Sequence, residues 1–447
     1  MMPPAKPVNE VVDLLDPRGN VLLNHTQQQA AEAVGSGQTE RIRQIQGQFA
    51  ICQPVGTTVR MARSIARPMR YYLSPHAAGP RLIVAERIDE IYQHLASHGL
   101  HEPFQPAATR MVPAHHLLEI SLVSGSDALP QLSRFFTPQT NCLPADIDAI
   151  GRHYIQQLQS ACHAWLDNIS PHEPIGVLFS GGVDSGSVLL LLHHLLQQRG
   201  ERPERLKAFT LAVAGQGQDL QQARQFLQAV GLEAFWEVIE VPVSAIDYRE
   251  AIRVIEDYKP LDVQSATMAL AMCREIRRRY PDWKYLIDGD GGDENLKDYP
   301  IEDSPPLTIR NVLGNRLLYQ EGWGVDAVKH SLVYSGGQSR GHVRTSAPAR
   351  LLGFEGFSPY ALPDVIEVAE AIPFVDLTGW DPQRLYPLKG QVVAAGIRAV
   401  TGIEMPRFEK RRFQKGVVDE STFAERFPAD PQVYRDTFAE LTPSGNR

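Results

Sequence analysis

Two short segments of the chain combine residue types that could bind a phosphorylated ligand. The first is "SGGVDS" at 180–185, in which two glycines and two serines surround Asp184. Backbone N–H groups in such a turn can form a nest for phosphate oxygens, and a helix that begins behind it adds its own donors. A carboxylate repels bare phosphate, so Asp184 implies a cation between them, usually Mg²⁺. The alternative is a glycine-rich turn in which Asp184 caps the following helix.

The second segment is "DGDGGDEN" at 288–295, which places four acids among three glycines: Asp288, Asp290, Asp293 and Glu294. Clustered carboxylates repel one another unless a metal ion or a cationic ligand compensates. The pair of segments predicts that Asp184 and Asp293 bind Mg²⁺-pyrophosphate from two sides. A solvated acidic loop is the alternative.

Both segments directly follow short apolar runs that read as buried strands, "IGVLF" at 175–179 and "KYLID" at 284–288. Further strand-like runs at 206–213 and 235–241 alternate with helical stretches. This alternation predicts βαβ units and a parallel sheet, whose loops share the carboxyl edge of the strands. Residues 1 to about 125 carry short β-like runs separated by Gly, Pro and Asn, which indicates a mostly antiparallel α+β unit.

The composition narrows the class of protein. The 447 residues carry a net charge of −8, which argues against nucleic acid as a partner because phosphate contacts need a basic field. The four cysteines are far apart, without a CxxC pair, as is typical of reduced thiols in the cytoplasm. No apolar window is long enough for a membrane span. We therefore expect a cytoplasmic protein with no membrane or nucleic-acid partner.

The order of these motifs carries a family resemblance. "SGGVDS" followed by "GDGGDE" resembles the asparagine synthetase B family of the N-type ATP pyrophosphatase superfamily, which includes β-lactam synthetases, carbapenam synthetases and lasso-peptide cyclases. The resemblance continues through "QSATMALAMCREI", "GFEGFSPYALPDVIEVAEAIPF" and "PRFEKRRFQKGV", and covers about 150–420. It implies a PP-loop synthetase domain, similar to adenine nucleotide α-hydrolases, with a parallel sheet and a helical C-terminal part.

The resemblance also implies roles for individual residues. The ATP phosphates would be held by the turn residues Ser180, Gly181, Gly182, Asp184 and Ser185. Asp184 and Asp293 would ligate Mg²⁺, and Ala214 and Gly289 would border the nucleoside. Lys410 has the spacing to Phe413 and Gly416 that the family's catalytic lysine has, and Lys389 and Lys415 are the alternatives. Without the resemblance, Lys410 would be interpreted as one cation of a solvated basic run or helix end.

The reaction that the resemblance implies is an AMP-forming carbon–nitrogen ligation. ATP adenylates a carboxylate, and ammonia or an amine then displaces AMP. Asp290 stands where relatives carry glutamate or tyrosine, and an acid there could accept the proton of the amine.

The N-terminal third resembles the later strands of the family's Ntn-type amidotransferase domain in "GQFAICQP" and "RLIVAERIDEI". Position 2 is Met2 instead of the catalytic cysteine, and the glutamine-binding segments are missing. We expect a shortened, inactive amidotransferase-like domain over 1–130, a linker over 131–150, the synthetase domain over 151–430 and a tail over 431–447. The glycine-rich, basic segment 334–350, with Arg340, Arg344 and Arg350, is interpreted first as a mobile surface loop and second as a lid or a contact for an acidic substrate.

The expected partners are a small-molecule or peptide carboxylate and an amine or ammonia, with a separate ammonia-supplying protein and a homodimer left open. Natural-product or peptide modification, including intramolecular cyclisation, fits this expectation. One alternative is an adenylating enzyme that transfers sulfur or modifies tRNA, which the acidic charge and the lack of paired cysteines disfavour. Another is a non-catalytic scaffold, which would not need Asp184, Asp293 and Lys410.

Overall fold

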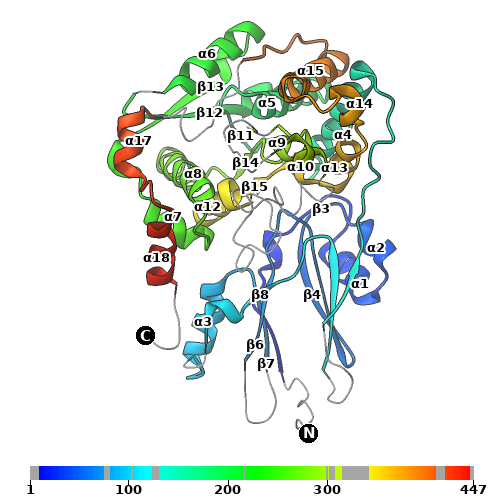
Figure 1. Cartoon of the computed structure of the whole chain (residues 1–447), viewed down its shortest axis with the longest axis vertical. Helices are drawn as coiled ribbons and strands as arrows, with labels where there is room; N and C mark the ends of the chain where they lie inside the picture. The colour runs from blue at the N-terminus through cyan, green and yellow to red at the C-terminus, as the bar shows by residue number, and fades with distance from the viewer. Residues whose placement is uncertain are drawn as a thin grey trace. The chain divides into compact units, whose positions relative to one another are not determined.

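The computed structural model describes residues 10–74, 81–101, 104–122, 130–215, 217–298, 301, 308–314, 342–408 and 418–442. The chain divides into two compact units, each considered by itself. Unit 1 contains the described residues up to Thr137 and those from Asp436 onward, and unit 2 contains those from Pro138 to Arg435. Figure 1 labels the helices and strands where there is room.

Unit 1 is an α+β unit, as the sequence predicts, built on two four-stranded sheets with the orders β1-β7-β6-β8 and β10-β9-β5-β4. Neighbouring strands are antiparallel except for the parallel pair β1 and β7. The strands are β1 Glu10–Asp13, β2 Val21–Leu22, β3 Gly47–Gln48, β4 Ala50–Val55, β5 Thr58–Arg63, β6 Arg70–Ser74, β7 Arg81–Ala85, β8 Arg110–Met111, β9 His116–Ser121 and β10 Gln131–Arg134, and the helices are α1 Gln27–Ser36, α2 Thr39–Arg43 and α3 Ile88–Ser97.

The alternating side chains of these strands build two apolar layers in unit 1. Met61 and Leu118 from one sheet pack with Tyr71 and Leu82 from the other, which makes the sheets two sides of one core. Tyr72 and neighbouring residues point the other way and pack against α3. The period-2 alternation of side chains thus gives β6 and β7 two buried faces.

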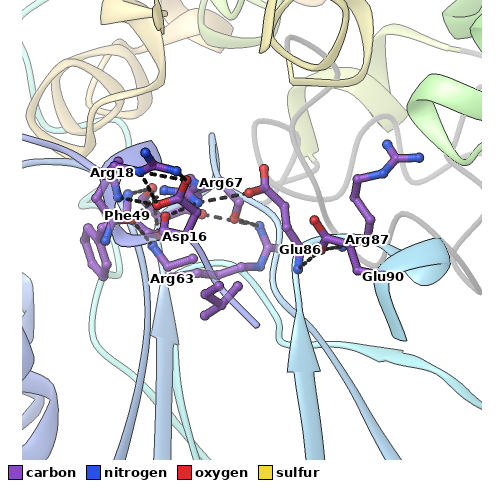
Figure 2. Close-up of polar contacts among 12 residues, drawn as sticks. Asp16, Arg18, Phe49, Arg63, Arg67, Glu86, Arg87 and Glu90 are labelled. Atoms are coloured by element: carbon purple, nitrogen blue, oxygen red, sulfur yellow. Dashed lines mark hydrogen bonds and ion pairs between the residues drawn. The ribbon is translucent and has the colours of Figure 1, made fainter. Parts of the chain in front are cut away.

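Buried arginines brace the ends of the strands in unit 1 (Figure 2). Arg67 donates through Nη1 to Asn20 Oδ1 at 2.8 Å and through Nη2 to Asp16 O at 3.0 Å and Glu86 Oε2 at 2.9 Å. Arg63 donates to the carbonyls of Val112 and Arg67. A buried charge is tolerated where hydrogen bonds replace its hydration, and here they tie together segments far apart in the sequence.

Unit 2 is built on a five-stranded, wholly parallel sheet with the order β13-β12-β11-β14-β15. Its strands are β11 Ile175–Leu178, β12 Leu206–Val213, β13 Trp236–Val241, β14 Tyr285–Ile287 and β15 Glu355–Phe357. The α/β fold with a parallel sheet is therefore as predicted. The strand order reverses between β11 and β14, and ligands of such sheets bind outside the carboxyl ends of the strands at this point.

Helices cover both faces of this sheet (Figure 1). The α-helices of this part of the chain are α4 Ile147–Leu166, α5 Val183–Gln198, α6 Gln218–Val230, α7 Tyr248–Ile255, α8 Pro260–Arg279, α9 Gly292–Asn295, α10 Ile309–Gly314, α12 Ala347–Leu351, α13 Pro363–Glu370, α14 Phe374–Thr378, α15 Pro382–Thr401 and α17 Glu420–Arg426, and α18 Pro431–Leu441 lies at the C-terminal end. The expected linker over 131–150 contains β10 and the start of α4, and the expected tail over 431–447 contains α18. In the described part of the chain, no helix is long and apolar enough to cross a bilayer.

The core of unit 2 fixes the sheet between its helices. Apolar side chains on one face, such as Phe209 and Leu211, form a buried cluster with Met268 and Ile276 of α8. On the other side of the sheet, α5 packs on β11 and β12 and contacts both α4 and α15.

The contact of α4 with α15 depends on two glycines. A Cβ on Gly396 would lie 2.2 Å from Gly151 O, and one on Gly151 would lie 2.3 Å from Val392 O. Only glycine allows the two helix backbones to approach this closely. The contact matters because α15 carries Lys389.

Candidate functional site

The turn between β11 and α5 has the geometry of an anion site. Gly181 has a φ of +75°, and a Cβ there would lie 2.6 Å from Ala223 N, so the position requires glycine. α5 begins at Val183 with Gly182 as its N-cap, a residue with no side chain to accept the first N–H bonds of the helix. The hydroxyls of Ser180 and Ser185 lie 3.3 Å apart in the turn. Asp184 therefore lies inside the first turn of α5 and is not its cap.

The acidic loop follows β14, the strand next to β11. Asp288 is buried and accepts hydrogen bonds from Ser358 Oγ and from Asp290 N, both at 3.0 Å. A Cβ on Gly289 would lie 2.6 Å from Ser185 N, and one on Gly292 would lie 2.2 Å from Asp184 Oδ1. The glycines of this loop thus let it pack directly on the first turn of α5.

The two acids predicted to bind a metal meet at one cation, the ammonium of Lys389 on α15. Lys389 Nζ contacts both Asp184 Oδ2 and Asp293 Oδ1 and lies 3.6 Å from Asp298 Oδ2. Burial by itself would lower the pKa of Lys389, but Asp184, Asp293 and Asp298 outweigh it and hold the pKa well above its ordinary value. The side chain is only 5% exposed and stays charged.

This arrangement fits a divalent cation held together with phosphate. Asp184 and Asp293 contact the same small cationic group, so an oxygen of each could also reach one metal ion. Among the described residues, no group of three or more His, Cys, Asp and Glu side chains could hold a metal ion by itself. Mg²⁺ characteristically takes one or two carboxylates and completes its shell with substrate phosphates and water. Asp184 and Asp293 are the residues that would hold it.

Asp290 lies beside this centre in a different electrostatic environment. Burial raises its pKa to about 6, opposed by a hydrogen bond from Thr345 and by the charge of Arg344. Arg344 Nε pairs with the fully buried Asp262 Oδ1 at 3.2 Å. Within the segment expected as a surface loop, residues 342–350 are helical and Arg344 lies in the acidic site, whereas residues 334–341 lie outside the described residues.

The remaining predicted positions are Ala214, Lys410 and Lys415. Ala214 follows β12 with a φ of +52° and an exposed side chain, and its N–H donates to Val241 O at 2.9 Å. Lys410 and Lys415 lie outside the described residues. Of the three lysines, Lys389 is the one that the structure places beside Asp184.

One acid of the site escapes sequence reasoning. Asp298 follows Asp293 by five residues, outside the glycine-rich motif, and only its distance to Lys389 assigns it to the centre. The continuation of the acidic run in "DENLKD" is the signal that could have indicated it.

Comparison with known proteins agrees with this geometry. No curated protein is significantly similar to the chain. Residues 167–339 match the family model described as asparagine synthase. The matched range includes β11, β14 and the two loops that meet at Lys389, and it indicates a domain for ATP-dependent ligase chemistry. The likeness to the asparagine synthase family therefore covers residues 167–339.

Proposed function

We propose that the chain is an AMP-forming carbon–nitrogen ligase, which adenylates a substrate carboxylate with ATP and passes the acyl group to ammonia or an amine. The observation that carries this proposal is the convergence of Asp184 and Asp293 on one cationic centre beside the N-terminus of α5. Because that centre lies at the reversal of strand order between β11 and β14, it occupies the usual ligand position of a parallel sheet.

In the first half-reaction, the chain's own groups bind and orient ATP. The N–H groups of the first turn of α5 and the hydroxyls of Ser180 and Ser185 donate to phosphate oxygens. Bound Mg²⁺ would neutralise charge that develops on the leaving pyrophosphate. A carboxylate oxygen of the substrate attacks the α-phosphorus, the bond from that phosphorus to the bridging oxygen breaks, and pyrophosphate leaves. Lys389 keeps a positive charge next to the carboxylates, which limits their repulsion of the phosphates.

In the second half-reaction, the amine nitrogen attacks the acyl carbon, the bond from that carbon to the AMP oxygen breaks, and AMP leaves. Asp290 is the base that takes the amine proton, because a carboxyl group with a pKa of about 6 is largely ionised at neutral pH and still a useful proton acceptor. Lys410 is proposed to stabilise the tetrahedral intermediate on the strength of its spacing in the sequence.

The nitrogen comes from a free amine, from an amine within the same substrate, or from ammonia that a separate protein supplies. Cys52, the cysteine of unit 1, is buried in the core of the two sheets, and burial raises the pKa of its thiol. A protonated, enclosed thiol does not serve as a glutaminase nucleophile. This supports a chain without its own glutaminase activity. We propose natural-product or peptide modification as its setting because the resemblance includes enzymes of that kind.

Exchange of labelled pyrophosphate into ATP tests the proposal. With Mg²⁺ and pools of carboxylic acids, at least one pool should support exchange, because adenylation is reversible before the amine arrives. Asp184→Asn should abolish exchange, whereas Asp376→Asn, which changes an exposed acid of α14, should not. If every pool failed and the protein also did not bind ATP, the scaffold alternative would replace the ligase.

A further inference from the structure

A fully buried tyrosine, Tyr360, contacts both the first turns of α5 and the acidic loop after β14. It belongs to the turn that follows β15, and its hydroxyl lies 2.5 Å from Ser187 Oγ. Ser187 in turn donates to the backbone carbonyl of Asp184 at 2.7 Å. The serine hydroxyl has one proton and uses it on Asp184, so the Tyr360 hydroxyl must be the donor to Ser187. The phenol is thus linked through Ser187 to the backbone of Asp184 in the first turn of α5.

The backbone of the same tyrosine supports the second loop. Tyr360 O accepts a hydrogen bond at 3.0 Å from Asn295 Nδ2, which also donates to Tyr154 OH at 3.2 Å. Asn295 is the last residue of α9, the short helix that contains Asp293. A Cβ on Gly291 would approach Tyr360 Cβ to 3.1 Å, so the loop also packs against the tyrosine itself.

The surroundings keep this network in one protonation state. Burial raises the pKa of Tyr360 well above its ordinary value, and the nearby Tyr154 and the charge of Asp184 act in the same direction. The phenol therefore stays a hydrogen-bond donor over the whole neutral range. A single buried residue is bonded through its side chain to the helix of Asp184 and through its backbone to the helix of Asp293.

We propose that Tyr360 is a positioning residue that sets the separation between Asp184 and Asp293, and thereby the affinity of this pair for a divalent cation. The inference rests on the proposed function, because it concerns the same metal site. Two carboxylates bind one small ion well only if both reach it without strain, and Mg²⁺ tolerates little deviation from its preferred geometry. Loss of the Tyr360 hydroxyl would remove its hydrogen bond to Ser187 of α5, the helix that carries Asp184. The hydrogen bond from Asn295 of α9 to the Tyr360 carbonyl would remain.

The test is Tyr360→Phe, which removes the hydroxyl and preserves the ring and the backbone carbonyl. Binding of Mn²⁺ to the protein with ATP present, followed by electron paramagnetic resonance, should weaken about fivefold, the scale of one net hydrogen bond. ATP affinity without metal should change less than Mn²⁺ binding does, because several N–H groups share the phosphates whereas two carboxylates must meet at one ion. Ser187→Ala should weaken Mn²⁺ binding equally, and the double variant should be no worse than either single one, because the two hydroxyls act in series.

Tyr434→Phe is the matched control, since Tyr434 is equally buried in unit 2 and its hydroxyl lies 3.5 Å from Gln264 Nε2, in a different contact. It should leave Mn²⁺ binding as in the wild type. If the wild type binds Mn²⁺ with ATP and Tyr360→Phe binds it equally well, the positioning role is overturned and the ligase proposal stands. If the wild type does not bind Mn²⁺ with ATP, both are overturned.

Discussion

Replacing Lys389 with methionine tests the central feature of the site. Met keeps an unbranched side chain of similar length but removes the ammonium that contacts Asp184 and Asp293. The variant loses the contacts of this ammonium with the two carboxylates and its 3.6 Å approach to Asp298 Oδ2. We expect Lys389→Met to be destabilised in the absence of divalent ions and to regain stability when Mg²⁺ is added.

The magnitude follows from the contacts. Two oxygens that both contact one nitrogen lie no more than about 6 Å apart. At an effective dielectric constant of about 20, two unit charges at that distance repel by about 3 kcal/mol. Removing one partner of a buried ion pair costs a similar amount, about 3–5 kcal/mol. A loss of about 3 kcal/mol should lower the melting temperature by roughly 6–12 °C in a unit of this size.

The assay is thermal unfolding with and without Mg²⁺, and the chain offers a matched control. Lys297 is also 5% exposed, and its ammonium pairs at 3.0 Å with a different carboxylate, that of the buried Glu370. Lys297→Met should lose stability by a comparable amount, but Mg²⁺ should not restore it. In the wild type, Mg²⁺ should raise the melting temperature less than in Lys389→Met, because Lys389 already supplies part of the compensating charge.

Two outcomes would refute this reasoning. Lys389→Met could melt at the wild-type temperature without Mg²⁺, which would mean that the carboxylates do not depend on the ammonium. Alternatively, Mg²⁺ could stabilise Lys389→Met and Lys297→Met equally, which would place its binding site away from the two aspartates.

Three further variants test other parts of the molecule. Asp290→Asn should preserve carboxylate-dependent pyrophosphate exchange but stop amide formation; joint loss of both activities would contradict its role as the base. Lys410→Ala should stop product formation while ATP still binds, and full activity would refute its assignment. His115 is buried against Phe135 and Phe136, where burial and neighbouring charges, Arg63 among them, hold its pKa well below the ordinary value. The unfolded chain therefore binds an extra proton below about pH 6.5, and stability falls by about 1 kcal/mol between about pH 7 and pH 5.5. In His115→Asn, whose asparagine tolerates the left-handed backbone at this position, urea unfolding should show a smaller loss of stability between pH 7 and pH 5.5. The same pH dependence of stability in the variant and the wild type would exclude this role of His115.

The sequence alone determined the elements whose signals are local. The strand at 206–213 is found with the bounds that its apolar run predicts, and α5 follows the glycine-rich turn directly, with Gly182 as its N-cap. The two glycine-and-acid loops, their position after strands and their common edge of a parallel sheet also follow from residue types and spacing. These features depend on backbone preferences and hydrophobic periodicity, which act over a few residues.

Only the tertiary structure decided which groups meet. Lys389 is separated by 205 residues from Asp184 and by 96 from Asp293 in the chain, and it reaches them because Gly151 and Gly396 let α15 pack closely on α4. The strand order that puts β14 next to β11 is likewise a property of the whole sheet. Contacts of this kind depend on side-chain packing between elements that are distant in the sequence. The hydrophobic periodicity of one segment therefore does not predict them. The sequence determined that two glycine-rich loops carry Asp184 and Asp293, and the fold decided that both aspartates contact one cation.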